Sequence, residues 1–147
     1  MGKSIQALED EQAFTHALAD ALEQLGWEII HRPSLENEPL IVSRPSTYRI
    51  LLRYVYHRPQ INRILIYILF GGRGPENRSP EALRAVNQLN DAYNLAKLSI
   101  DKDGDVWCHT VFPFGAALDT EVFSAYLEWW DAALTVWAQE HLKPFMA

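Results

Sequence analysis

Three aspartates stand at alternate positions in one short segment, which is the spacing of the first three ligands of a calcium-binding loop. They are Asp101, Asp103 and Asp105, and carboxylate oxygens are ligands that calcium prefers. Such a loop also needs a glycine at its sixth position and a glutamate at its twelfth. Here Gly104 is at the fourth position and Phe112 at the twelfth. The dipeptide Asp103-Gly104 is typical of a tight two-residue hairpin turn, so we predict a solvated turn and no metal site.

A glycine-rich segment offers a second kind of chemistry, the binding of an anion. It begins Gly71-Gly72-Arg73-Gly74 and is followed by Arg78, so backbone N–H groups and two guanidinium groups could surround a phosphate. The segment fits neither the dinucleotide fingerprint nor the P-loop, which requires Lys-Ser or Lys-Thr after its last glycine. We therefore predict a connecting loop. Anion or nucleotide binding by Arg73 and Arg78 in the Gly71–Ser79 loop is kept as the alternative function.

Cys108 beside His109 suggests a thiol nucleophile with its base. Adjacent residues of a strand point to opposite sides of the sheet, so this histidine cannot take the thiol proton. Cys108 is therefore predicted to be a small buried strand residue. As the only cysteine, it excludes an internal disulfide, which favours a reducing compartment. No other nucleophile and base can be paired, so we predict a protein that is not an enzyme and needs no cofactor.

Three asparagines fall on one face of a predicted helix. They are Asn87, Asn90 and Asn94. Amide side chains both donate and accept hydrogen bonds, so these residues can either cap the helix and contact the sheet or read a ligand. We expect the structural role, and the ligand-reading role stays open.

The remaining residues indicate the elements that position these groups. Apolar residues at three- and four-residue steps predict a helix between Asp10 and Gly26. Ser79-Pro80 and Asp119 mark the starts of two more helices, the last of which ends near His141. The second helix is predicted to bury Leu83, Val86, Leu89, Tyr93 and Ala96. Alternating or continuous apolar runs predict strands at 27–31, 40–42, 48–57, 62–70, 97–100 and 106–112.

Hairpins dominate this order of elements, and no regular alternation of strand and helix occurs. We therefore predict an α+β fold with a mostly antiparallel sheet and helices on one side. No linker long enough to divide the chain is present, so residues 1–147 are predicted to form a single domain.

Two elements carry more apolar surface than contact with one neighbour requires. The strand 62–70 is apolar on both faces, which is usual for a central strand or one covered on its second face by another element or subunit. The last helix has an apolar face that consists of Val122, Tyr126, Trp129, Ala133, Val136 and Trp137. Phe123, Leu127, Trp130 and Leu134 extend this face to about half the cylinder, although a single contact needs a stripe of only ~100°. We expect the excess to meet the first helix or a partner chain.

Aromatic residues favour interfaces because they bury a large area at little cost in entropy, and Trp107 is one of several candidates. A core that lies wholly within one monomer is the alternative, which stays open. The residues predicted for a partner or dimer interface are Tyr48, Tyr54, Tyr56, Phe123, Leu127, Trp130 and Leu134.

Three segments of the carboxyl half carry a resemblance to a known family. They are Val86-Asn87-Gln88-Leu89-Asn90, Ala96-Lys97-Leu98-Ser99-Ile100-Asp101 and Asp103-Gly104-Asp105-Val106-Trp107, followed by Asp119, Glu121 and Phe123 in the pattern D-x-E-x-F. In these segments the chain resembles the YbjN-domain family from Val86 to about Val136, and its amino-terminal half matches only in the order of elements. The resemblance implies the fold of type III secretion chaperones, α-β-β-β-α-β-β-α and commonly homodimeric. It also implies a regulatory or chaperone-like role without catalytic residues.

Charge and hydropathy narrow the range of partners. The net charge is −6 and the basic residues are scattered, so we expect neither nucleic acid nor a membrane as partner. The longest apolar run, residues 64–70, is far shorter than the ~20 residues of a membrane helix, and the first residues lack the apolar core of a signal peptide. We predict a cytoplasmic, non-enzymatic protein-binding module, chaperone-like or regulatory, that acts as a homodimer and grips an unidentified protein segment.

Overall fold

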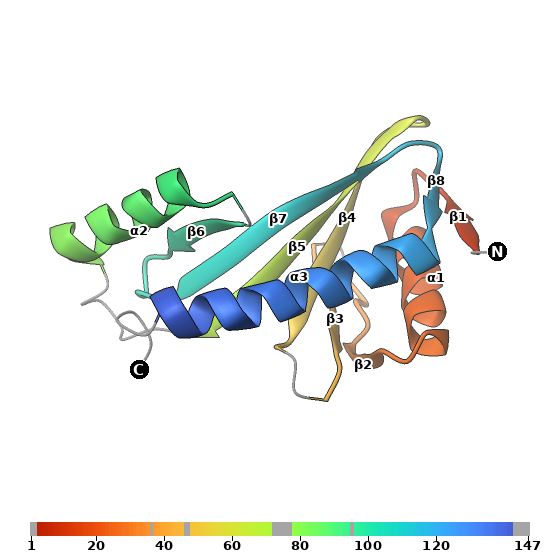
Figure 1. Ribbon diagram of the computed structural model, residues 1–147. Coiled ribbons are helices and arrows are strands. Elements are labelled where there is room, and N and C mark those ends of the chain that lie inside the picture. The colour runs from red at the N-terminus through yellow and green to blue at the C-terminus, as the bar shows by residue number, and fades with distance from the viewer. Residues whose placement is uncertain (1–2, 36, 46–47, 72–77, 95, 143–147) are drawn as a thin grey trace.

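A six-stranded antiparallel sheet forms the centre of the molecule (Figure 1). The computed structural model describes residues 3–35, 37–45, 48–71, 78–94 and 96–142. Across the sheet the strands follow the order β2-β3-β4-β5-β7-β6, and all neighbours pair antiparallel. Their bounds are Glu28–His31 for β2, Leu40–Ser43 for β3, Ile50–Arg58 for β4, Ile61–Gly71 for β5, Lys97–Ile100 for β6 and Val106–Phe114 for β7. The predicted antiparallel sheet is therefore confirmed.

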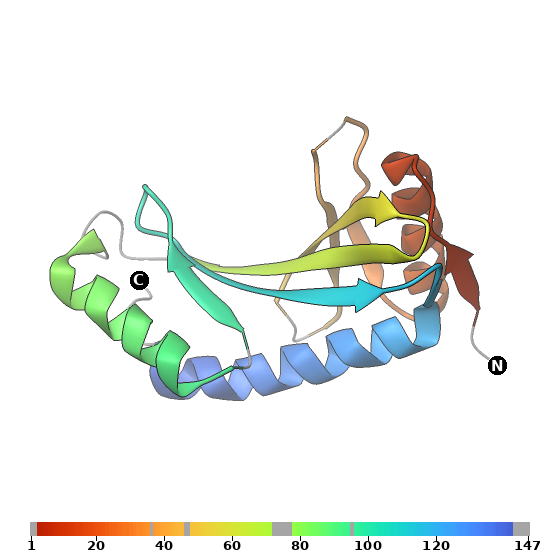
Figure 2. The ribbon, with the colours of Figure 1, turned by 90° about the horizontal axis from the view of Figure 1, so that it is seen from above.

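Three helices and a small two-stranded sheet complete the described part of the chain. The helices are α1 (Glu11–Gln24), α2 (Pro80–Ala92) and α3 (Thr120–His141), and the small sheet pairs β1 (Ser4–Gln6) with β8 (Ala117–Asp119). α3 runs along one face of the large sheet, α1 packs near β4 and β2, and α2 lies against β6 at the edge (Figure 2). The predicted α+β fold is confirmed. Of the described helices, none has both the length and the apolar character that crossing a membrane requires.

Side chains of β4, β5 and β7 alternate between two faces, as the pleat of a strand requires. The inner face, which meets α1 and α3, carries buried side chains: Ile50, Leu52, Tyr54, Ile64, Ile66, Ile68, Val106 and Cys108. The outer face carries the residues between them: Leu51, Arg53, Val55, Arg63, Leu65, Tyr67, Leu69, Trp107, His109 and Val111. β5 lies between β4 and β7, so the prediction that this doubly apolar strand is central is confirmed.

The helix starts lie where the sequence predicted them, because their capping residues act locally. Asp10, Ser79 and Asp119 each accept a hydrogen bond from a backbone N–H two or three residues later. Pro80 occupies the first turn of α2, where its missing N–H has no partner to lose. Gly26 ends α1 with a φ of 95°, a left-handed conformation that glycine adopts at little cost.

The side of α3 that was predicted to face a partner packs on the sheet instead. Phe123, Leu127, Trp130 and Leu134 were predicted for an interface, yet all are 0% exposed within this single chain. The ring of Phe123 packs edge-on against Phe112 of β7, with 5.1 Å between ring centroids. These four residues belong to the core of the chain itself, which corrects the prediction. The outward side of α3 instead carries Val122, Trp129 and Val136.

A buried polar contact accompanies the packing of α3 on the sheet. The indole N–H of Trp27 donates to the hydroxyl of Ser124 at 2.9 Å. Both apolar stripes of the helix repeat at the same three- and four-residue steps, so periodicity alone cannot choose between them. In the structure the side that contains Phe123 faces the sheet and the side that contains Val122 faces outward.

The strand β1 was not predicted, and side-chain contacts hold it in place. The hydroxyl of Tyr54 donates to the carbonyl oxygen of Leu8 at 2.9 Å and accepts from its N–H at 3.1 Å. The hydroxyl of Thr120 donates to the carbonyl oxygen of Lys3 at 3.0 Å. A strand of three residues is too short for an alternating pattern to be visible in the sequence.

The predicted buried stripe of α2 is confirmed in part. Val86 is buried, and Leu89 and Ala96 pack against the core, as expected. Leu83 and Tyr93 are each 41% exposed, and Ala82 and Ala85 pack against the core as well.

Asn90 covers the free edge of β6 as a neighbouring strand would. Its Oδ1 accepts from the backbone N–H of Leu98 at 2.8 Å, and its Nδ2 donates to the carbonyl oxygen of Leu98 at 3.0 Å. An uncovered edge would present unpaired backbone groups to other chains. The predicted helix–sheet contact is thus confirmed for this asparagine.

Replacing Asn90 with alanine is expected to lower the free energy of unfolding by roughly 1–3 kcal/mol, because two half-buried backbone groups of Leu98 lose their partner. Urea unfolding followed by circular dichroism measures the change. The matched control is Asn87→Ala on the exposed side of the same helix, which should change stability by less than about 0.5 kcal/mol. Equal effects of the two substitutions would contradict the structural role of Asn90.

Candidate binding surface

The outer face of the sheet carries apolar side chains on the side of β5 and β7 away from α3. The segment between β2 and β3 borders this face, with Asn37 and Pro39 beside Leu51, Tyr67 and Trp107 (Figure 2). Cross-strand neighbours join its residues into rows, of which Leu51, Tyr67 and His109 form one and Arg53, Leu65 and Val111 the next. Antiparallel sheets commonly leave one face to water, but that face is then mainly polar. An apolar outer face therefore calls for a ligand or partner.

Three aromatic rings lie together at the centre of the outer face. Tyr67 stacks on His109 with 5.8 Å between ring centroids and meets Trp107 edge-on at 6.4 Å. Beside them lies a hollow of about 500 Å³, also lined by Leu51 and Arg53. Aromatic side chains in a hollow are typical anchors of protein interfaces, because they bury a large area and lose few rotamers.

The turn between β6 and β7 orients one of these rings. Oδ2 of Asp101 accepts from the indole N–H of Trp107 at 2.9 Å, while its Oδ1 accepts from the backbone N–H groups of Asp103 and Asp105. The bond from Trp107 is the largest of several that lower the pKa of Asp101. All the carboxylate oxygens of Asp101 are thus committed to shaping the hairpin.

The same turn differs from the two-residue type that was predicted. The N–H of Gly104 donates to the carbonyl oxygen of Asp101 at 3.0 Å. The N–H of Asp101 donates to the carbonyl oxygen of Asp105, also at 3.0 Å. The loop therefore contains three residues, and Gly104 closes it with a φ of 84°. The Asp-Gly dipeptide located the hairpin correctly but not its length. Within the described ranges, no three His, Cys, Asp or Glu side chains are grouped so that they could hold a metal.

The charges on the outer face differ in sign from those of the whole chain. The chain carries a net charge of −6. The outward positions of β4, β5, β6 and β7 nevertheless include Arg53, Arg63 and Lys97 and no carboxylate. A locally basic and apolar surface on an acidic protein attracts acidic partners and orients them.

His109 joins the aromatic and the basic parts of this surface. Burial lowers the pKa of His109, and the positive charge of Lys97 on the neighbouring strand lowers it further. Near pH 7 the ring is therefore neutral and stacks on Tyr67 as an apolar group.

Cys108 lies on the inner face of the sheet and His109 on the outer one, as the alternation of strand side chains predicted. The side chain of Cys108 is 0% exposed, and burial raises its pKa to about 12. The thiol is protonated at neutral pH and cannot act as a nucleophile. The prediction of a small buried strand residue is confirmed.

Of the two arginines named for the alternative anion site, only Arg78 lies within the described residues. Arg73 lies outside the described ranges. Arg78 donates from Nη1 to the carbonyl oxygens of Ile100 and Asp101, at 2.9 and 2.8 Å. Its guanidinium group thus fastens the start of α2 to the β6–β7 turn.

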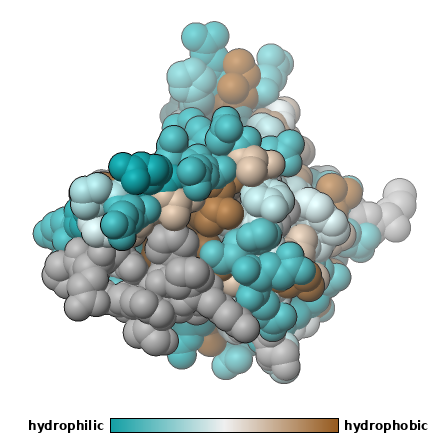
Figure 3. Space-filling view, turned by 60° about the vertical axis from the view of Figure 1, so that its left-hand side comes forward, coloured by the Kyte–Doolittle hydropathy of each residue, from teal (hydrophilic) through white to brown (hydrophobic). Residues whose placement is uncertain are grey.

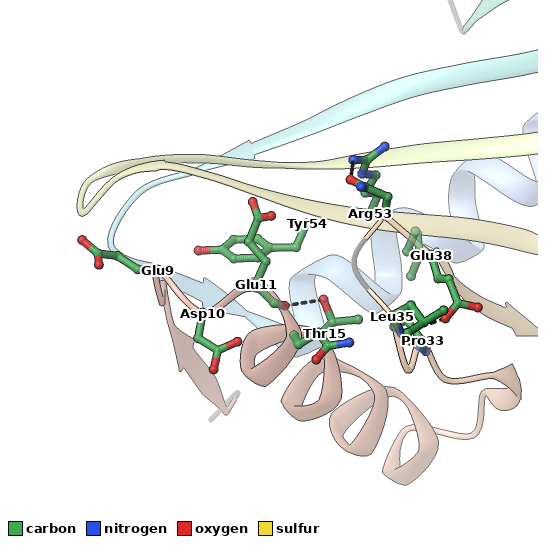
Figure 4. A pocket seen from close by; sticks show the side chains of 12 residues that line it. Glu9, Asp10, Glu11, Thr15, Pro33, Leu35, Glu38, Arg53 and Tyr54 are labelled. Carbon is green, nitrogen blue, oxygen red and sulfur yellow. Dashed lines mark hydrogen bonds between the residues drawn. The ribbon is translucent and has the colours of Figure 1, made fainter.

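An acidic hollow lies at the start of α1, and several of its carboxylates accept hydrogen bonds from the backbone (Figure 4). Its volume is about 280 Å³, and Glu9, Asp10, Glu11 and Glu38 contribute to its lining. Asp10 caps α1, and Oε2 of Glu11 accepts from a backbone N–H of β4 at 2.8 Å. Oε1 of Glu38 accepts from two backbone N–H groups of the loop after β2, and the bond from Leu35 is the largest cause of its lowered pKa. Asp10, Glu11 and Glu38 thus stabilise the local backbone through hydrogen bonds.

A third hollow, of about 610 Å³, separates the end of α2 from β6 and β7 and includes Asn94 in its lining. From the end of the molecule where α2 lies, the described surface is mainly hydrophilic, with small hydrophobic areas between the polar ones (Figure 3). This composition contrasts with the outer face.

The tyrosines predicted for an interface lie on the inner side of β4 or just before it. Tyr54 is 3% exposed and stacks on Phe14 of α1, with 3.8 Å between ring centroids. Tyr48 packs edge-on against Phe70 at 4.8 Å, and Tyr56 is half-buried against the core. Their aromatic character reflects core packing, which corrects the prediction for Tyr54 in particular.

Sequence reasoning had named Trp107 as an interface residue and strand 62–70 as apolar on both faces, but it did not select Tyr67 or His109. The signal was present in the strand pattern, because Leu65, Tyr67 and Leu69 form its second apolar side. What the pattern lacked was the pairing of β5 with β7, which places Tyr67 beside His109.

Fold and surface together define an α+β domain with helices on one face of an antiparallel sheet and an aromatic, locally basic surface on the other. The chain belongs to the YbjN family, whose model, described as "Putative bacterial sensory transduction regulator", matches residues 16–140. The resemblance seen in the carboxyl half is thereby confirmed and extended to most of the chain. The chain matches no curated protein and no solved structure, so the likeness to secretion chaperones stays a prediction.

The titration of His109 provides a test of this surface. Its pKa in the folded protein should lie below the ordinary value near 6.5, and Lys97→Met should raise it without fully restoring it, because burial is the larger cause. NMR titration of the imidazole protons measures both values. Since the unfolded chain binds this proton more readily, the stability contributed by neutral His109 is present above the ordinary pKa and is lost as the pH falls through the folded one.

Lys102→Met is the matched control for this titration, because Lys102 is exposed in the β6–β7 turn and is not among the causes of the shift. It should leave the midpoint of His109 unchanged. A His109 midpoint at or above the ordinary value in the wild-type chain would show that this ring is not buried as described.

Proposed function

We propose that the chain is a non-enzymatic, protein-binding regulatory module that acts as a homodimer in the cytoplasm and holds a segment of a partner protein on the outer face of its sheet. The observation that carries the proposal is the half-buried cluster of Tyr67, Trp107 and His109 beside a hollow in the outer face. The family description, a regulator of sensory transduction, agrees with a protein that acts through contacts rather than through chemistry.

The partner segment is proposed to be acidic, with aromatic or aliphatic side chains as anchors. Leu51, Leu65 and Val111 offer apolar contacts on either side of the aromatic cluster. Arg53, Arg63 and Lys97 surround this area, and no carboxylate stands on the outward positions of these strands. Acidic side chains on the segment would pair with these cations, which gives orientation and a fast rate of association.

Single-stranded nucleic acid is the less favoured occupant. Binding without sequence preference needs a basic groove along the phosphates, whereas this chain has a net charge of −6. The anion site at the Gly71–Ser79 loop is not favoured by any contact, because Arg78 is engaged with two carbonyl oxygens.

Selection of peptides from a random display library on the immobilised wild-type chain tests this proposal. The enriched peptides should combine Asp or Glu with aromatic or aliphatic residues. Tyr67→Ala and Leu65→Asp should each weaken their binding by about tenfold or more, because both remove apolar contact at the centre of the surface. Raising the salt concentration should weaken binding further, through the screening of Arg53, Arg63 and Lys97.

The matched control is Leu83→Ala, which shortens an exposed apolar residue of α2 outside the outer face and should leave peptide binding unchanged. The proposal would be overturned if no peptides were enriched, or if Tyr67→Ala bound them as well as the wild type. Competition by oligothymidylate at low micromolar concentration would identify the surface as one for nucleic acid.

A further inference from the structure

One cation of the outer face is oriented by a neighbour that does not neutralise it. Nη2 of Arg53 donates to the amide oxygen of Asn37, in the loop between β2 and β3. Arg44, by contrast, forms an ion pair with Glu128. Of the carboxylates that the structure describes, none forms an ion pair with Arg53. Because an amide oxygen carries no full charge, the guanidinium group of Arg53 keeps its positive charge and its other N–H donors for a ligand.

The loop holds Asn37 in a conformation that few residues adopt. Asn37 has a φ of 69°, and no other non-glycine residue in the described ranges has a positive φ. Asparagine reaches this left-handed region more readily than most side chains. The next residue, Glu38, accepts hydrogen bonds from the backbone N–H groups of Ser34 and Leu35. These bonds close the loop on itself, so that the amide of Asn37 is presented to the guanidinium group.

Arg53 also lines the hollow of about 500 Å³ in the outer face, together with Leu51, Tyr67 and Trp107. Among the described residues of this lining, Arg53 alone is permanently charged. Arg53 borders the acidic hollow as well, but its guanidinium group points away from the carboxylate of Glu38 (Figure 4). Apolar walls with one charged group are typical of a binding site, because the walls supply contact area and the charge fixes the orientation of the ligand.

The register of the sheet sets the distance between the charged and the aromatic parts of this hollow. Tyr67 pairs with Leu51, which precedes Arg53 by two residues on the same face of β4. Arg53 and Tyr67 are therefore diagonal neighbours, roughly 7–8 Å apart. In an extended segment, side chains two positions apart point to the same side and lie about 7 Å apart. A carboxylate and an apolar side chain with this spacing match Arg53 and Tyr67.

We propose that Arg53 determines the specificity of the outer face, by binding the carboxylate of an Asp or Glu that lies two positions from the apolar side chain in contact with Tyr67. This inference rests on the proposed function and names the sequence pattern of the partner segment. A guanidinium group binds a carboxylate through two parallel hydrogen bonds, which fixes the direction of the acidic side chain. Asn37 acts as a positioning residue for Arg53. Arg63 and Lys97 do not line the hollow, and they attract the segment from a distance.

A double-mutant cycle tests the contact between Arg53 and the carboxylate. The first probe is the peptide that the wild-type chain enriches most strongly from the library, and the second carries Asn or Gln in place of its acidic residue. Arg53→Gln should weaken the acidic peptide by about fivefold or more and the amide peptide by less than about twofold, because only the acidic one loses an ion pair. Arg53→Glu should instead enrich peptides with Lys or Arg at the same position. Isothermal titration calorimetry measures the affinities.

Asn37→Asp separates the charge of Arg53 from its position. Aspartate tolerates a left-handed backbone as asparagine does, and its carboxylate can still accept the hydrogen bond from Arg53, but it neutralises the guanidinium group. The acidic peptide should therefore bind about fivefold or more weakly, a change that a merely structural role of Asn37 does not predict. Gln60→Glu adds the same charge in the turn between β4 and β5, outside the hollow, and should change the affinity by less than about twofold.

Arg63→Gln is the matched control for Arg53→Gln, because Arg63 also points outward from the sheet but does not line the hollow. It should change the preference for the acidic over the amide peptide by less than about twofold. Circular dichroism verifies that each variant is folded.

The outcomes separate this inference from the function on which it rests. If Arg63→Gln reduced the preference as much as Arg53→Gln, or if Asn37→Asp bound the acidic peptide as well as the wild type, the role of Arg53 would be refuted. Peptide binding that depends on Tyr67 would still support the binding module in that case. If the wild-type chain enriched no peptide, both the module and the role of Arg53 would fall.

Discussion

Both long helices cover the same face of the six-stranded sheet, and this one-sided packing determines most of what the molecule can do. β5 has apolar side chains on both faces, and its backbone hydrogen bonds require a neighbour on each side. Its place between β4 and β7 therefore satisfies the backbone. Only one of its faces receives a helix, so Leu65 and Tyr67 are left on the other. An apolar sheet face in water is unfavourable unless something binds there.

A polar side chain of α2 occupies part of one edge of the sheet. Asn90 bonds the backbone N–H and C=O of Leu98 in β6, so an incoming strand would find that position taken. Strand addition relies on free backbone groups, and the proposed binding therefore uses the side chains of the outer face instead. The same helix α2 is tied to the β6–β7 turn by Arg78, which keeps this end of the sheet in place.

Several acidic residues stabilise loops and helix starts. Asp10, Glu11, Glu38 and Asp101 each accept hydrogen bonds from backbone N–H groups, and such bonds favour the ionised carboxylate. The net negative charge is thus spread over turns and helix starts rather than gathered into a site. The outer face differs from the rest of the chain, because the outward positions of β4, β5, β6 and β7 carry cations among apolar residues and no carboxylates.

The sequence by itself determined the order of the helices and of the six strands of the large sheet, the helix starts at Asp10, Ser79 and Asp119, and the two sides of the long strands, because capping and pleating act between residues close in the chain. It placed Cys108 and His109 on opposite faces for the same reason. The tertiary structure added the short strands β1 and β8 and decided which of two equally spaced stripes of α3 is buried. That choice involves residues far apart in the chain, such as Trp27 and Ser124, which form a buried hydrogen bond. No local sequence pattern encodes a contact between residues so far apart. The residues predicted for the interface on α3 are therefore part of the core, and the exposed surfaces could be identified only from the tertiary structure.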